Sequence, residues 1–277
     1  MEGIIIKNQS NDYTVRTKNG IYVCKPRGKF RKENITPLVG DFVVIDDINK
    51  YLLEIKPRKN SLIRPSIANI DIALIATSVK EPNFDSNLLD KLLTIIEYNN
   101  ITPIICLTKI DLLNSEEDKK IKKIMNYYKK IGYHVVENTD KKEIKKLING
   151  KTVVLAGQSG AGKSSLLNSL DKNLDLQTNE ISKALGRGKH TTRCVTLYEI
   201  EGGFIADTPG FSSVDFRDMT KLDIRDNMKE MFDNLEYCKY RDCMHIKEDD
   251  CKVKSLVEEG KILSSRYENY KLFVGGK

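Results

Sequence analysis

The segment from Gly157 to Ser164 is the part of the chain whose residue types and spacing most directly predict chemistry. It fits the pattern G-x-x-x-x-G-K-[ST] in full, between an apolar strand-like stretch at 152–157 and a helix-like stretch at 164–170. Glycines let backbone N–H groups turn toward a phosphate, a lysine neutralises phosphate oxygens, and the last hydroxyl binds Mg²⁺. We therefore predict a phosphate-binding loop formed by Gly157, Gln158, Ser159, Gly160, Ala161, Gly162, Lys163, Ser164 and Ser165, with Ser164 on Mg²⁺.

A second element follows about fifty residues later, where the strand-like run 203–208 ends in D-T-P-G, residues 207–210. In nucleotide hydrolases such a turn brings a carboxylate to Mg²⁺ and a glycine N–H to the terminal phosphate. We predict these roles for Asp207 and Gly210.

The base-reading element is expected before the phosphate loop, in T-K-I-D at 108–111. It is similar to the N-K-x-D element of GTPases, in which the aspartate accepts hydrogen bonds from guanine N1–H and N2–H₂. Adenine lacks both donors, so Asp111 would favour GTP over ATP. Lys109 would lie along the base, and Thr108 would make a weaker contact to N7 than asparagine does. A P-loop ATPase or kinase in which this segment is an ordinary turn remains the alternative.

Four metal-binding side chains lie within 14 residues near the C-terminus, namely Cys238, Cys243, His245 and Cys251. Three cysteines and one histidine are a ligand set that tetrahedral Zn²⁺ accepts, and with no open position the site would be structural. Six cysteines without an export signal also indicate a reducing compartment, so we expect a cytoplasmic protein. No apolar run approaches the ~20 residues that span a bilayer, so we expect no membrane contact.

The net charge of +7 is concentrated near the N-terminus, because residues 1–68 hold 13 Lys and Arg against 7 Asp and Glu. A basic surface of this kind fits the phosphate backbone of RNA, although a solvated face is the alternative. The candidate RNA-binding residues are Lys25, Arg27, Lys29, Arg31 and Lys32.

The expected elements divide the chain into three parts. Residues 1–67 contain five short strands, at 3–6, 13–17, 21–25, 42–46 and 51–56, which suit a small β-barrel such as an OB-fold. Residues 68–217 alternate strands and helices, which favours a mostly parallel α/β sheet. Residues 218–277 form a small zinc-binding tail, with a helical segment expected near 220–234 and a final amphipathic helix near 253–272.

The order of the motifs, base element before phosphate loop, resembles the RsgA family of bacterial GTPases, also called YjeQ or YloQ. The similarity extends over T-P-L-V-G-D (36–41), A-N-I-D (68–71), residues 157–168 and G-R-G-K-H-T-T-R (186–193). It implies an OB-fold barrel, a circularly permuted P-loop GTPase and a zinc-binding tail. It also implies GTP hydrolysis stimulated by the small ribosomal subunit, in late maturation of that subunit and through rRNA contacts. The expected partners are GTP or GDP, the small subunit and its rRNA, and the expected state is a monomer.

The resemblance also implies a switch at 186–192. Thr191 or Thr192 would complete the Mg²⁺ and γ-phosphate coordination, with Thr192 favoured. Phe211 follows the D-T-P-G glycine and cannot orient water, so His190 is the catalytic candidate. The alternatives for His190 are an RNA contact or simple exposure. A non-enzymatic RNA-binding module ordered by nucleotide is the further alternative for the whole chain.

Overall fold

The computed structural model describes residues 1–62, 65–171, 195–207 and 215–276. The chain forms two compact units, and each draws on several stretches of sequence. The first comprises Met1–Leu74, Asp140–Ala156 and Lys163–Phe211; the second comprises Ile75–Thr139, Gly157–Gly162 and Ser212–Lys277.

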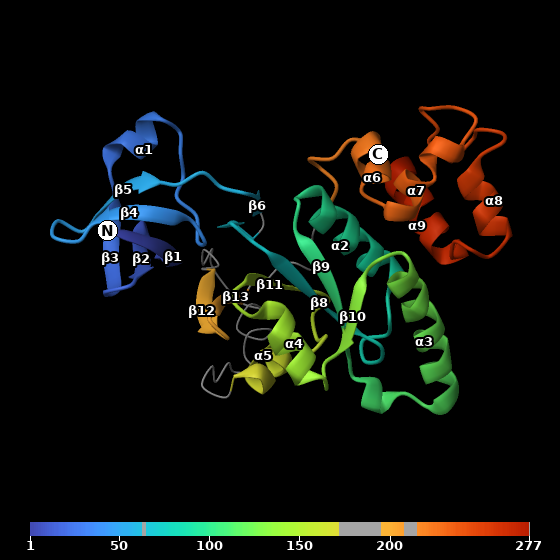
Figure 1. Ribbon diagram of the computed structural model, residues 1–277, viewed down its shortest axis with the longest axis horizontal. Coiled ribbons are helices and arrows are strands. Elements are labelled where there is room, and N and C mark those ends of the chain that lie inside the picture. The colour runs from blue at the N-terminus through green and yellow to red at the C-terminus, as the bar shows by residue number, and fades with distance from the viewer. Residues whose placement is uncertain (63–64, 172–194, 208–214, 277) are drawn as a thin grey trace, which may run out of the picture. The chain divides into compact units, whose positions relative to one another are not determined.

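Five strands of the first unit close into a barrel, which Figure 1 shows in blue. They are β1 (Glu2–Gln9), β2 (Asp12–Thr17), β3 (Gly20–Pro26), β4 (Phe42–Asp46) and β5 (Tyr51–Ile55). The order is β1-β2-β3-β5-β4, and β4 pairs back with β1; only the β3–β5 pair is parallel. Alternation along each strand buries Ile5, Val15 and Cys24. A short helix, α1 (Gly28–Lys32), follows β3. The five predicted strands and the OB-like barrel are confirmed.

The remaining elements of the first unit lie outside the barrel. They are β6 (Ser61–Leu62), β7 (Ile67–Ala68), the start of β8 (Ile72–Ser78), α4 (Lys141–Ile148), β11 (Thr152–Ala156), α5 (Lys163–Leu170), β12 (Thr196–Ile200) and β13 (Gly203–Asp207). Strands β11 and β13 run parallel, whereas β12 and β13 form an antiparallel hairpin. Strand β12 also pairs with β1 of the barrel, with Lys7 opposite Thr196. The barrel therefore continues directly into this sheet.

The second unit contains the other strands and helices of the α/β part. After the end of β8 come α2 (Ser86–Tyr98), β9 (Thr102–Thr108), the 3₁₀ turn η1 (Ile110–Leu112), α3 (Ser115–Lys130) and β10 (His134–Glu137). Strand β9 lies between β8 and β10 and is parallel to β10. Asp85 caps α2, and Asn114 with Glu117 forms a capping box at α3. This alternation confirms the predicted α/β class.

The C-terminal helices are shorter than the sequence pattern predicts. They are α6 (Lys221–Asp226), α7 (Lys229–Asp233), the turn η4 (Leu235–Tyr237), α8 (Lys252–Glu258) and α9 (Ser264–Gly275). The helical segment expected near 220–234 consists of α6 and α7, whereas the single helix expected near 253–272 is wrong. Met228 is extended, with φ −110° and ψ 101°, and this separates α6 from α7. Gly260 has φ +68°, a left-handed conformation that ends helices, and this separates α8 from α9.

Among the residues that the structure describes, none of the helices has the length and apolar character needed to cross a bilayer.

Candidate functional site

The loop at 157–162 follows β11 and leads into α5. Gly157 has φ +124°, and a Cβ atom at this position would lie 2.2 Å from the carbonyl oxygen of Ala76 in β8. No other residue fits that approach, so the first glycine of the motif is fixed by packing. Gly160 and Gly162 also have positive φ, +78° and +81°, and the Ala161 N–H donates to the Gln158 carbonyl at 3.1 Å. All three glycines of the loop thus have backbone conformations that other residues rarely adopt.

Thr108 connects this loop to the end of β9. Its side chain is buried, and its hydroxyl donates to the carbonyl oxygen of Ala161 at 2.8 Å. The hydroxyl proton is therefore used to support the phosphate loop, a role that the expectation of a weak N7 contact did not include. This hydrogen bond brings the two predicted motifs together, although 46 residues separate Asp111 from Gly157.

Lys109 and Asp111 lie just beyond Thr108. Lys109 has φ +60° and is the N-cap residue of η1, and its ammonium donates to the carbonyl oxygen of Glu81. Asp111 lies within η1 and is exposed. An exposed carboxylate in the turn that follows β9 can accept hydrogen bonds from a ligand.

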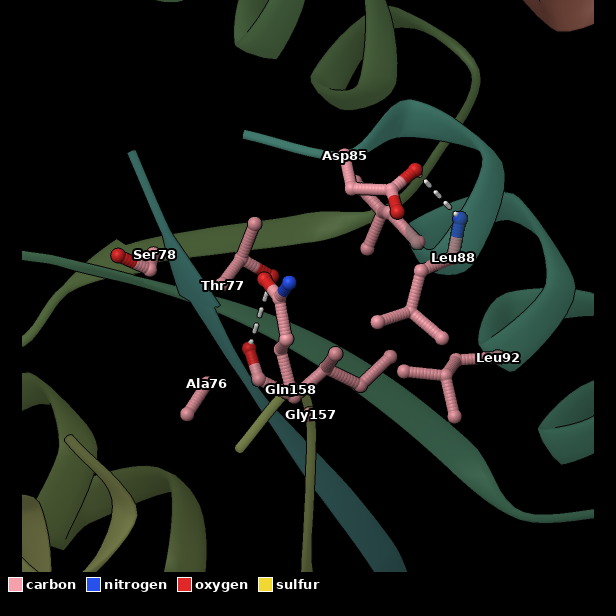
Figure 2. Close-up of a pocket in the computed structure, with 10 residues that line it drawn as sticks. Ala76, Thr77, Ser78, Asp85, Leu88, Leu92, Gly157 and Gln158 are labelled. Atoms are coloured by element: carbon pink, nitrogen blue, oxygen red, sulfur yellow. Dashed lines mark hydrogen bonds between the residues drawn. The ribbon is translucent and has the colours of Figure 1, made fainter. Parts of the chain in front are cut away.

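A small pocket lies beside the first turn of the loop (Figure 2). It is lined by Ala76, Thr77 and Ser78 at the end of β8, by Asp85, Leu88 and Leu92 at α2, and by Gly157 and Gln158. Its cavity of about 20 Å³ has room for about one water molecule. The pocket is therefore far too small for a nucleotide base.

The first unit contains the other residues that the sequence predicts for phosphate and Mg²⁺ binding. Lys163, Ser164 and Ser165 form the first turn of α5, whose Leu166, Leu167 and Leu170 are buried. Because β11 and β13 are parallel neighbours, their carboxyl ends lie at the same edge of the sheet. One end leads into the phosphate loop and the other is Asp207. This is the relation that the two phosphate motifs require.

The four predicted metal ligands lie together in the tail. One donor atom from each of Cys238, Cys243, His245 and Cys251 lies within 4.8 Å of the others. His245 directs Nδ1 at the sulfurs, 3.3 Å from Cys251 Sγ and 3.6 Å from Cys238 Sγ, and its Nε2 lies 3.1 Å from the carbonyl of Met231. That carbonyl selects the tautomer whose Nδ1 is free to bind a metal. Burial lowers the pKa of His245, which keeps the ring neutral as a ligand must be. The cluster could hold a metal ion.

Comparisons with known proteins decide the family. A family model described as RsgA GTPase matches residues 55–217, and one described as RsgA N-terminal domain matches residues 2–51. This chain belongs to the RsgA GTPase family. The proteins named small ribosomal subunit biogenesis GTPase RsgA 1 of Listeria monocytogenes and RsgA of Bacillus cytotoxicus are similar to it. They are 48% and 49% identical over 98% and 99% of this chain, and over 95% and 96% of their own lengths.

Solved structures of RsgA-type proteins agree with this assignment. YloQ, described as a circularly permuted GTPase, superposes with a TM-score of 0.84 at 38% identity, covering 99% of this chain and 94% of its own. YjeQ from Thermotoga maritima gives a TM-score of 0.83 at 32% identity, covering 100% and 99%. The permuted RsgA GTPase fold and GTP-hydrolysing class expected from the sequence are thus confirmed, and the ATPase alternative is not favoured.

Several predicted site residues of this RsgA-family chain lie outside the described residues. These are His190, Thr191, Thr192 and Gly210, together with Phe211. Their roles stay predictions. The five basic residues of the barrel are described and all are exposed, Lys25 on β3, Arg27 just before α1, and Lys29, Arg31 and Lys32 on α1.

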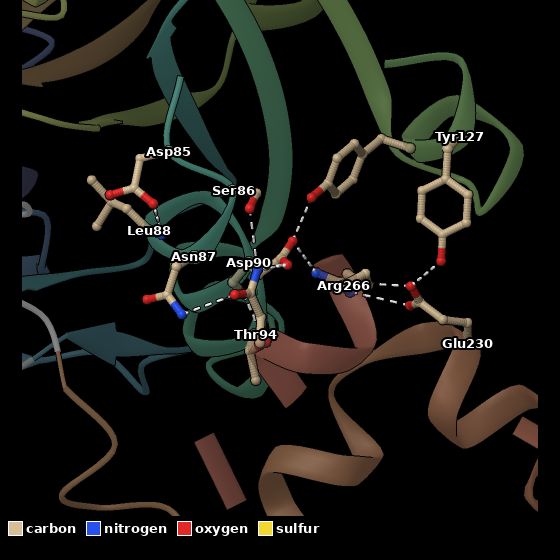
Figure 3. A network of polar contacts seen from close by, with 11 residues as sticks. Asp85, Ser86, Asn87, Leu88, Asp90, Thr94, Tyr127, Glu230 and Arg266 are labelled. Carbon is tan, nitrogen blue, oxygen red and sulfur yellow. Dashed lines mark hydrogen bonds and ion pairs between the residues drawn. The ribbon is translucent and has the colours of Figure 1, made fainter. Parts of the chain in front are cut away.

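Sequence reasoning missed a buried charge network in the second unit (Figure 3). Arg266 of α9 is fully buried, and its guanidinium contacts Asp90 of α2 at 2.7 Å and Glu230 of α7 at 2.8 Å. Tyr128 and Tyr127 of α3 donate hydroxyl protons to the same two carboxylates. The network joins α2, α3, α7 and α9. The signal available in the sequence was an arginine on a helix face whose other residues, Tyr267, Tyr270 and Phe273, are aromatic.

Proposed function

We propose that this chain binds GTP with Mg²⁺, hydrolyses it to GDP and phosphate, and acts in biogenesis of the small ribosomal subunit. The observation that carries the proposal is the hydrogen bond from Thr108 to Ala161, which joins the base-reading segment to the phosphate loop in permuted order. Membership of the RsgA GTPase family supports the reaction, and the names of the relatives support the process.

Each site residue has a proposed role. The N–H groups of residues 157–165 and the Lys163 ammonium bind the phosphates, and Ser164 and Asp207 bind Mg²⁺ together with Thr192. The Gly210 N–H binds the γ-phosphate. Asp111 reads guanine, and Lys109 lies along the base. Exposure of Asp111 supports its role, since the carboxylate is accessible to a ligand.

His190 is the proposed catalytic group, because the side chain of Phe211 has no atom that can hydrogen-bond to water. A neutral imidazole can accept a hydrogen bond from the attacking water, and such groups contribute about 10²–10⁴-fold. His190→Ala should lower subunit-stimulated turnover by a factor in that range, while GTP affinity and unstimulated turnover change little. Thr191→Ala and Thr192→Ala are the controls, since the Mg²⁺-binding threonine also sets the preference for GTP over GDP. Full stimulated turnover by His190→Ala with normal subunit binding would remove the histidine from catalysis.

Outside the nucleotide site, we propose a structural Zn²⁺ on Cys238, Cys243, His245 and Cys251, because three thiolates and an imidazole favour that ion. We propose that the basic barrel residues contact rRNA and that the protein is a cytoplasmic monomer, since ribosomal subunits are assembled in the cytoplasm. Domain boundaries at 1–67, 68–217 and 218–277 are proposed as the functional division of the chain.

One experiment tests the function against its alternatives. Phosphate release is measured with GTP and with ATP, each with and without purified small subunits. The proposal expects turnover of GTP that rises when subunits are added, and little competition by ATP. Equal use of both nucleotides would support a P-loop ATPase. Subunit binding without turnover would support a nucleotide-ordered RNA-binding module.

A further inference from the structure

A second basic region lies outside the barrel, and the net charge of the whole chain does not reveal it. Residues 119–151 contain eleven lysines, no arginine and three acidic residues, which gives a local net charge of +8. Acidic residues elsewhere in the chain balance it, so the segment does not stand out when the whole chain beyond residue 68 is counted. Six of these lysines belong to α3.

Three lysines of α3 lie along one line on its exposed face. At 100° per residue, Lys119, Lys123 and Lys130 fall within about 40° of one another and extend over about 16 Å of the helix. All three are exposed, as is Asn126 between them. The opposite side of the helix contains the buried Met125 and Tyr128. We call Lys119, Lys123 and Lys130 the α3 lysine row.

The acidic residues of α3 do not neutralise the row. Of its three acidic residues, Glu117 binds Lys80 at 2.8 Å and Asp118 binds Lys122 at 2.7 Å. The third, Glu116, is exposed and forms no ion pair with the row among the described residues. Within the part of the chain that the structure describes, no ion pair is formed by Lys119, Lys123 or Lys130. Three positive charges on one line therefore face solvent without a partner.

The helix that carries the row is held rigidly from its buried side. Its Tyr127 and Tyr128 hydroxyls donate to Glu230 and Asp90, the carboxylates that also bind Arg266 (Figure 3). The capping box at Asn114 fixes its first turn. The row is thus presented on a fixed helix, which lowers the ordering cost of binding an extended polyanion.

We infer that the α3 lysine row binds the phosphate backbone of small-subunit RNA, as a contact separate from the barrel. The inference rests on the proposed function, in which small-subunit RNA is the polyanion that the protein binds. Lysines act as point charges and provide no bidentate recognition of a base edge, so the contact positions the protein and reads no sequence. Each phosphate contact releases about one counterion, which makes binding dependent on salt.

The test measures affinity for purified small subunits at several salt concentrations. The triple variant Lys119→Gln, Lys123→Gln, Lys130→Gln should lower the slope of log affinity against log salt by about two to three units. It should weaken binding about 10- to 100-fold at roughly 0.1 M salt. The triple Lys→Arg variant keeps the charges and should bind as wild type does. Affinity for GTP and the melting temperature should be unchanged in both.

A matched control removes three lysines that already have acidic partners, Lys122 with Asp118, Lys261 with Glu259 and Lys271 with Glu268. This control should leave the salt slope nearly unchanged.

An unchanged slope in the row variant, with normal subunit binding by wild type, would overturn the inference while leaving the proposed function intact. Equal losses in row and control variants would also overturn it, since net charge alone would then explain both. Failure of wild type to bind subunits would refute the proposed function and the inference together. Loss of binding to anionic lipid vesicles without loss of subunit binding would assign the row to a membrane and overturn the RNA contact.

Discussion

Thr108→Val removes a hydroxyl from the end of β9 while keeping nearly the same shape. In the wild type that hydroxyl donates to the carbonyl oxygen of Ala161 at 2.8 Å, and both residues are buried. In the variant the carbonyl loses this donor at a position without access to bulk water. The loss of a hydrogen bond that leaves a buried group unsatisfied costs about 1–3 kcal/mol. Phosphate binding requires the loop geometry that this hydrogen bond supports. A cost of about 1–3 kcal/mol on that geometry therefore lowers the affinity for GTP and GDP about 5- to 150-fold.

The assay separates support of the loop from contact with the base. Affinities for GTP and for 7-deaza-GTP, which lacks N7, are measured in wild type, Thr108→Val and Thr108→Ser. Because the hydroxyl donates to Ala161, the variant should lose affinity for both nucleotides equally. Thr108→Ser keeps the hydroxyl and should stay within a few-fold of wild type. Wild-type affinity in Thr108→Val would refute the reasoning. If wild type prefers GTP over 7-deaza-GTP and Thr108→Val loses that preference, the result would support the contact between Thr108 and N7.

Three further changes test other parts of the molecule. Asp111→Asn should shift preference from GTP toward xanthosine triphosphate, because an amide can donate where xanthine has a carbonyl, and competition binding measures this; unchanged GTP affinity would exclude Asp111 as the base reader. Cys243→Ser should lower zinc content by metal analysis and increase hydrogen exchange across 238–251, with nucleotide affinity within a few-fold; zinc-free wild-type protein would remove the site. Arg266→Met leaves Asp90 and Glu230 buried without their cation and should destabilise the protein by about 3–5 kcal/mol in denaturant unfolding, whereas a loss below about 1 kcal/mol would show that the carboxylates find other partners.

The sequence predicted those features that depend on local pattern. The strand-like stretch at 152–157, the helix-like stretch at 164–170 and the five barrel strands agree closely with the structure, because spacing and periodicity specify them. Thr108 shows the limit of such reasoning. Its motif position suggested a base contact, but its hydrogen-bond partner lies 53 residues away and depends on how two loops pack.

The helices of the tail show a second limit. Periodicity across 253–272 favoured one amphipathic helix, but Gly260 adopts a left-handed conformation there. Arg266 lies beyond that break, and its partners Asp90 and Glu230 are distant in sequence. A pairing of this kind leaves no trace in a single sequence other than a charge on an apolar face.

The buried network around Arg266 also limits how the chain can change over time and how it can be engineered. The guanidinium bridges two carboxylates that come from different helices, so a neutral replacement of Arg266 leaves both of them in the interior without their cation. Only coordinated replacement of all three with matching apolar residues avoids that penalty. Chimeras that exchange the C-terminal tail, which contains positions 230 and 266, should therefore be stable only when the recipient has a residue at position 90 that matches this pair.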